Sequence, residues 1–185
     1  TVKFPLEGLD DVDKFLSIPY VPPAVAPAPF HALKARAGEE ALVMVGIGDA
    51  ICLPASWFSP EGFCLAWADA PDLVEQLTAV AADRINARVD ALCRAGVDAF
   101  RIVGGEYASV QLGPRGFDEL VMPFDRELVA LMHRYGAIAY YHNHGPVSGF
   151  LERFAELGID ALDPLEASPW GDVDLAEAKR RIGDR

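Results

Sequence analysis

The sequence is poor in the features that mark several large classes of protein. Its three cysteines, Cys52, Cys64 and Cys93, form no Cys-x-x-Cys or Cys-x-x-His pair, which argues against a disulfide framework and against a structural zinc site. It has no stretch of about 18 apolar residues and no charged-then-apolar leader, so we expect neither a transmembrane helix nor a signal peptide. These absences predict a cytoplasmic protein with no membrane partner.

Positive charge is also scarce. Lys and Arg number 16 against 28 Asp and Glu, which gives a formal net charge of -12 at pH 7. Nucleic-acid binding depends on clustered Lys and Arg, and the sequence has no such cluster. We therefore expect no nucleic-acid partner and look instead for a small-molecule site.

The sequence does contain enough apolar residues, 51% of the chain, for one sizeable core. We expect a single domain over residues 1–185. Within it, residues 1–30 are predicted to form an N-terminal connector, because residues 21–30 are rich in Pro and Ala and suit neither a helix nor a central strand.

One unit recurs along the rest of the chain: a helix that ends at a glycine and is followed at once by a short apolar strand. The predicted helices span residues 31–37, 71–95, 116–135, 147–157 and 175–182, and the predicted strands span residues 42–47, 99–103, 137–141 and 160–162. The continuous apolar run at residues 42–47 further predicts a strand covered on both faces. Such alternation is typical of an α/β fold with parallel strands.

The ends of the predicted strands indicate which α/β fold this is. No Gly-x-Gly-x-x-Gly or Gly-x-x-x-x-Gly-Lys motif follows a strand, so the fingerprint of a nucleotide-binding open sheet is missing. Instead, polar residues follow each strand in turn: Asp49, then Glu106 and Tyr107, then His142 and His144, then Asp163 and Glu166. A TIM (β/α)8 barrel collects its site from many strand ends in this way. We predict such a barrel, of which this chain covers about half, because a complete barrel has eight strands.

Residues 140–145, Tyr-Tyr-His-Asn-His-Gly, are the most informative segment. If the strand continues through them, the i, i+2 spacing places His142 and His144 on one face at its carboxyl end. Two imidazoles in that position are suited to bind a metal ion or to act as acid and base. The alternative is a pair of hydrogen-bonded core histidines.

Several segments together resemble one known superfamily. They are Gly104-Gly-Glu-Tyr, Leu112-Gly-Pro-Arg-Gly-Phe-Asp-Glu-Leu-Val-Met-Pro-Phe, His142-Asn-His-Gly-Pro, Gly158-Ile-Asp-Ala-Leu-Asp-Pro-Leu-Glu and Asp174-Leu-Ala-Glu-Ala-Lys-Arg-Arg-Ile-Gly-Asp-Arg. In order and spacing they resemble the uroporphyrinogen decarboxylase superfamily, which also contains the zinc-dependent corrinoid methyltransferases. The resemblance implies a TIM barrel, and the four predicted strands resemble its third to sixth.

The resemblance distinguishes two branches of that superfamily. The decarboxylases work without a metal and carry a Gly-Phe-x-Gly-x-Pro-x-Thr motif after the third strand, and the Pro and Thr of that motif are not recognisable in residues 45–62. The methyltransferases carry a zinc-binding His-x-Cys at the end of the fifth strand. His142 matches their histidine, and His144 stands where their cysteine would be. Imidazole is an acceptable zinc ligand, so the resemblance implies a zinc site at His142 and His144.

The most favoured function is therefore methyl transfer. The resemblance implies a zinc-dependent enzyme that moves a methyl group between a corrinoid, or another methyl donor, and a thiol that the zinc ion activates. The predicted catalytic carboxylates are Glu106, Asp163 and Glu166, which would accept a ring N–H from a histidine or complete the metal coordination. For each of them, a solvated loop or a strand-terminating turn is the alternative.

Two other functions stay open. One is a cofactor-free uroporphyrinogen decarboxylase of porphyrin biosynthesis, in which Arg101 and Arg115 would bind the carboxylates of a tetrapyrrole. The other is a noncatalytic half barrel whose exposed sheet edges require a partner chain, such as a second copy in a homo-oligomer.

Overall fold

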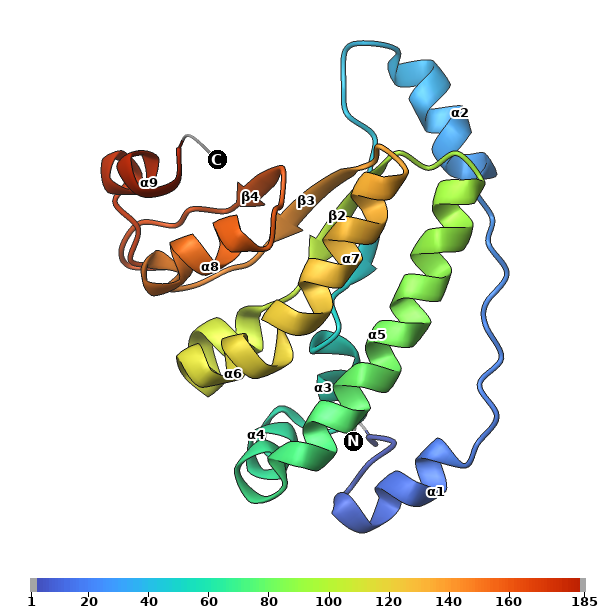
Figure 1. Cartoon of the computed structure of the whole chain (residues 1–185), viewed down its shortest axis with the longest axis vertical. Helices are drawn as coiled ribbons and strands as arrows, with labels where there is room; N and C mark the ends of the chain where they lie inside the picture. Colours follow the sequence, from blue (N-terminus) through green and yellow to red (C-terminus); the bar gives the residue numbers. More distant parts are fainter. Residues whose placement is uncertain (1–2, 184–185) are drawn as a thin grey trace.

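A computed structural model describes residues 3–183 of the chain. Its centre is one parallel sheet whose strands follow in chain order: β1 (Val45–Gly48), β2 (Ala99–Val103), β3 (Ile138–His142) and β4 (Ala161–Asp163). Helices connect the strands in a βα alternation (Figure 1). The α/β fold and the parallel order predicted from the sequence are therefore confirmed.

The helices vary from one turn to more than six turns in length. They are α1 (Val12–Leu16), α2 (Ala28–Ala37), α3 (Cys52–Trp57), α4 (Pro60–Asp69), α5 (Pro71–Arg94), α6 (Gly113–Leu120), α7 (Met122–Arg134), α8 (Leu151–Glu156) and α9 (Leu175–Ile182). Tight 3-10 turns lie at Leu9–Asp11 and Ser148–Phe150, and a π-helical turn lies at Tyr107–Leu112. Among residues 3–183, no helix combines the length and the apolar character needed to cross a bilayer.

Several predicted boundaries are wrong. The single helix expected over residues 116–135 is two helices, because Pro123 lies in the first turn of α7, where its missing N–H costs nothing, and Val121 separates α7 from α6. Helix α2 begins at Ala28, inside the segment expected to be irregular, again with a proline in its first turn. Strand β1 begins at Val45, three residues later than expected.

Helices cover one face of the sheet and leave the other face open. Phe100, Ile102, Ala139 and Tyr141 point to the helices and are fully buried, and Phe154 of α8 packs against the Tyr141 ring at a centroid distance of 5.4 Å. Helices α5 and α7 lie on this same side (Figure 1).

The opposite face is open. Gly46 and Gly48 are exposed, and Arg101, Tyr140 and His142, at matching positions in the neighbouring strands, are only partly buried. The expectation that β1 is covered on both faces is therefore wrong, because its alternate residues are glycines that face away from the helices. Helices outside and an open inner face are the arrangement of part of a TIM barrel.

Candidate metal centre at the carboxyl ends of the strands

His142 and His144 meet at the carboxyl end of β3. Their rings lie 4.5 Å apart between centroids and are nearly perpendicular, at 88°. The His142 side chain is 11% exposed and the His144 side chain 54% exposed. The strand β3 ends at His142, as expected, and His144 lies two residues beyond it. The chain beyond the strand nevertheless turns the second ring back onto the first.

Glu106 is the third member of this group. Glu106, His142 and His144 each offer one ligand atom, and these atoms all lie within 4.8 Å of one another. Glu106 directly precedes the π-helical turn that follows β2, and its Oε1 accepts a hydrogen bond from the His144 backbone N–H at 3.3 Å. Two imidazoles and one carboxylate are a donor set that suits zinc. We call Glu106, His142 and His144 the histidine cluster.

Asp163 and Glu166 each contact one of the two rings at its Nδ1 atom. Asp163 Oδ1 is 2.9 Å from His142 Nδ1, and Glu166 Oε1 is 3.2 Å from His144 Nδ1. The pKa of Glu166 is lowered, first because it accepts the Gly145 N–H at 2.8 Å and then because it faces His144. A carboxylate at Nδ1 favours the tautomer that leaves Nε2 free of hydrogen, which is the form that binds a metal.

Asn143, between the two histidines, was not singled out from the sequence. It is fully buried, and its Nδ2 donates to Ser109 Oγ at 3.0 Å and to the His144 carbonyl at 2.8 Å. Ser109 belongs to the π-helical turn that follows Glu106. Asn143 therefore fastens the segment carrying the histidines to the segment carrying the glutamate.

A second cluster of polar residues lies directly beneath, in the core. Asp49, Asp125 and Tyr141 are all buried. The Tyr141 hydroxyl lies 2.6 Å from Asp125 Oδ2 and 3.2 Å from Asp49 Oδ2. We call these three residues the buried carboxyl cluster. Tyr141 immediately precedes His142 in β3, so this strand contributes a neighbouring residue to each cluster.

Asp49 binds three donors from different parts of the chain. Its Oδ1 accepts the Cys52 N–H at 2.8 Å, and its Oδ2 accepts the Gly105 N–H at 2.6 Å and faces the Tyr141 hydroxyl. Gly105 directly precedes Glu106. Asp49, which follows β1, thus ties together the strand ends that carry Glu106 and His142.

Matching hydrogen-bond donors to acceptors in the buried carboxyl cluster places a proton on Asp125. A hydroxyl has one hydrogen, so Tyr141 donates to only one of the two carboxyls. Asp49 already accepts two backbone N–H groups and is the better acceptor for the third. A protonated Asp125, whose other oxygen accepts only the Ala50 N–H at 3.4 Å, then donates to Tyr141, and both contacts of the hydroxyl are satisfied. In agreement, burial and the neighbouring Asp49 charge raise the pKa of Asp125 well above its ordinary value, and burial raises that of Asp49.

This assignment predicts how stability changes with pH. Above the ordinary pKa of 3.8, the unfolded chain loses the Asp125 proton while the folded protein retains it up to its raised pKa. The free energy of unfolding should therefore fall as pH rises through that interval, and the contribution should be fully present below it. Urea unfolding from about pH 4 to 8 should show a smaller fall in Asp125→Asn than in the wild type. Parallel curves for the two proteins would contradict the assignment.

Two glycines allow the clusters to approach each other. A Cβ at Gly104 would lie 1.9 Å from Asp49 Cγ, and a Cβ at Gly105 would lie 2.4 Å from Asn143 Oδ1. Gly105 also has φ +77°, which favours glycine. The Gly104-Gly pair therefore lets the chain after β2 pass directly against Asp49 of the buried carboxyl cluster and against Asn143, which lies between the two histidines.

A sequence signal for Asp125 did exist. Asp125 lies on the buried stripe of α7, four residues after Val121 and three before Leu128. A carboxyl on an apolar stripe requires a partner, and that partner could have been sought. Tyr141 gave no comparable signal, because a tyrosine in an apolar strand is ordinary.

The two arginines considered for a tetrapyrrole differ in position. Arg101 lies on the open face of β2 and is partly buried. Arg115, on α6, pairs with Glu119 at 2.9 Å and stacks on Trp67. Arg101 therefore shares the open face of the sheet with His142, whereas the Arg115 guanidinium is engaged by Glu119 and Trp67.

Comparisons with known proteins identify the family and the fold. Residues 6–185 match the sequence model of the family described as uroporphyrinogen decarboxylase (URO-D). A solved methyltransferase from Methanosarcina mazei is similar with a TM-score of 0.69 and 18% identity, over 82% of this chain and 43% of its own. No curated protein matches the chain. The structural likeness confirms the partial TIM barrel, and this chain spans less than half the length of that methyltransferase.

Proposed function

Because the chain belongs to the uroporphyrinogen decarboxylase family, we propose that the protein is a zinc-dependent methyltransferase that moves a methyl group from a corrinoid, or another methyl donor, to a thiol. Glu106, His142 and His144 would hold the zinc ion. The observation that carries the proposal is that Glu106, His142 and His144 each offer one ligand atom within 4.8 Å of the others, while each ring Nδ1 also pairs with a carboxylate. The methyltransferase with the same fold supports the reaction class.

The protein's own residues have separate tasks in this proposal. Asp163 and Glu166 orient the two rings and fix their tautomers, and Glu106 completes the donor set. A bound zinc ion supplies the positive charge that lowers the pKa of the substrate thiol. The thiol proton leaves to solvent, the sulfur forms the bond to the methyl carbon, and the bond between methyl and donor breaks with its electron pair staying on the donor.

Zinc content tests the proposal. We expect about one zinc per chain in the wild type at its natural full length, and a loss of most of that zinc in His142→Ala and His144→Ala, because two donors cannot hold the ion firmly. The measurement is elemental analysis of protein purified without added metal.

His133→Ala is the matched control. His133 also pairs with a carboxylate, Asp160 at 3.0 Å, but lies on α7 outside the histidine cluster, so its removal should leave the zinc content unchanged. A wild type without zinc, or undiminished zinc in both cluster variants, would refute the proposal.

A further inference from the structure

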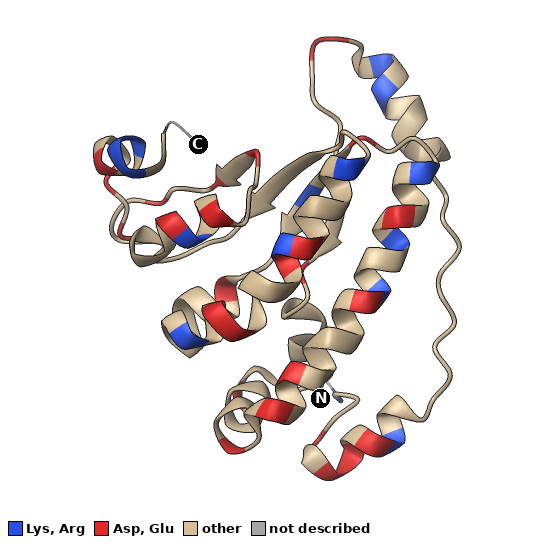
Figure 2. Ribbon diagram, viewed as in Figure 1, with Lys and Arg blue, Asp and Glu red and all other residues tan. Residues whose placement is uncertain are grey.

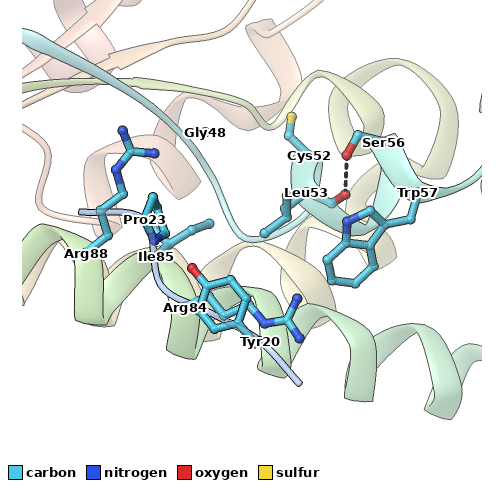
Figure 3. Close-up of a pocket in the computed structure, with 10 residues that line it drawn as sticks. All are labelled: Tyr20, Pro23, Gly48, Cys52, Leu53, Ser56, Trp57, Arg84, Ile85 and Arg88. Carbon is cyan, nitrogen blue, oxygen red and sulfur yellow. Dashed lines mark hydrogen bonds between the residues drawn. The ribbon is translucent and has the colours of Figure 1, made fainter. Parts of the chain in front are cut away.

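A cavity of about 480 Å³ lies beside the carboxyl end of β1, apart from the histidine cluster. Gly48 of β1 borders it, and in the sheet register Gly48 is two strands away from His142, which is about 10 Å. Connector residues Tyr20 and Pro23 close one side of it, and α5 forms the floor (Figure 3). The volume suits a small organic molecule.

Two cations from α5 face this cavity. Arg84 and Arg88 are one helical turn apart and both line the cavity (Figure 3). Like charges at this spacing repel each other. No acidic side chain lines the cavity, and neither arginine has an ion-pair partner within residues 3–183. In a chain with net charge -12, two adjacent cations without a counter-charge are unusual.

Aromatic and aliphatic groups form the rest of the lining. The Arg84 guanidinium lies 4.3 Å from the Tyr20 ring centroid and 5.6 Å from that of Trp57, so it is held in place by stacking. Leu53 and Ile85 add apolar surface beside the two arginines. Acidic and basic residues alternate along the second half of α5 (Figure 2), but the acidic ones there, Asp83 and Asp90, do not line the cavity, and Asp90 pairs with Arg94 at 2.8 Å. The charged side chains that line the cavity are therefore both cationic.

From this arrangement we propose that the cavity is a second binding site, which takes a small organic carboxylate with a flat apolar body. The carboxylate pairs with Arg88, whose guanidinium points away from that of Arg84 (Figure 3), while Arg84 adds positive charge to the cavity and the apolar body contacts Leu53, Ile85 and Trp57. The site does not depend on the histidine cluster, so its ligand binds whether or not zinc is present.

A pair of isosteric probes tests the charge requirement. Naphthalene-2-carboxylate should bind the protein at its natural full length with a Kd of about 1 mM or tighter, and naphthalene-2-carboxamide should bind about tenfold more weakly, because only the first is an anion. Isothermal titration calorimetry measures both, and binding of the carboxylate should weaken as salt is added.

Substitutions of the two arginines test whether the carboxylate binds in this cavity. Arg84→Gln with Arg88→Gln should weaken carboxylate binding about tenfold or more, since both cations are removed. Arg36→Gln, an exposed arginine of α2, is the matched control and should bind as the wild type does. Circular dichroism confirms that the double variant folds. Equal affinity for the amide, equal binding by the double variant, or no binding to the wild type would each overturn the proposal.

Discussion

Asp49→Asn should lower the free energy of unfolding by about 3 kcal/mol, whereas Asp125→Asn should lower it by about 1 kcal/mol or less. The two substitutions are chemically identical and both sites are buried. They differ in whether the groups around each carboxyl donate a hydrogen bond to it or accept one from it. Asp49 accepts the N–H groups of Cys52 and Gly105, so an amide NH2 at this position would meet a donor on one side or the other.

Asp125 accepts one long backbone hydrogen bond on Oδ1, from the Ala50 N–H at 3.4 Å, and its Oδ2 faces the Tyr141 hydroxyl. In our assignment it carries a proton and donates to Tyr141, and an asparagine NH2 donates in the same direction. Urea unfolding at neutral pH compares the two variants, and each serves as the control for the other. Equal losses, or a larger loss in Asp125→Asn, would show that the proton is not on Asp125.

The Asp49→Asn substitution should also disturb the positions of residues in the histidine cluster. Asp49 holds the Gly105 N–H next to Glu106 and contacts Tyr141 next to His142. Two of the three proposed metal donors therefore depend on one buried carboxylate that does not itself belong to their cluster. A polar core directly beneath a site fixes the positions of side chains that would otherwise rotate.

The strands and their order were predictable because their signals are local. Each strand is a short apolar run that follows a glycine-ended helix, and such runs remain strands wherever the sheet places them. Residues 42–44 show the limit of this reasoning. They are as apolar as strand residues, but β1 pairs with β2 only from Val45 onward. Pairing is a property of two segments, and one segment alone does not reveal it.

The candidate site was predictable in its members but not in its geometry. His142, His144, Glu106, Asp163 and Glu166 were all expected at strand ends, where parallel strands bring polar residues together. The sequence did not reveal that His144 lies beyond the strand, nor that a π-helical turn begins after Glu106. Asn143 and Ser109 join these two segments by a hydrogen bond across 34 positions of the chain.

Gly104→Ala tests whether the contact between β2 and Asp49 is as close as the structure has it. We expect a loss of about 3 kcal/mol in the free energy of unfolding, because a Cβ 1.9 Å from Asp49 Cγ forces a buried carboxylate away from its donors. Gly46→Ala is the matched control. It lies in β1, where a Cβ would meet nothing within 4 Å, and should change stability by less than about 0.5 kcal/mol.

A double variant identifies the cause of that loss. If the clash is with the Asp49 side chain, Asp49→Ala removes the obstacle, and Gly104→Ala should then cost much less than it does in the wild type. The coupling between the two substitutions, measured by urea unfolding of the four proteins, should exceed about 1 kcal/mol. Additive losses would mean that the added methyl group clashes elsewhere, and a Gly104→Ala protein as stable as Gly46→Ala would mean that β2 and Asp49 are not in contact.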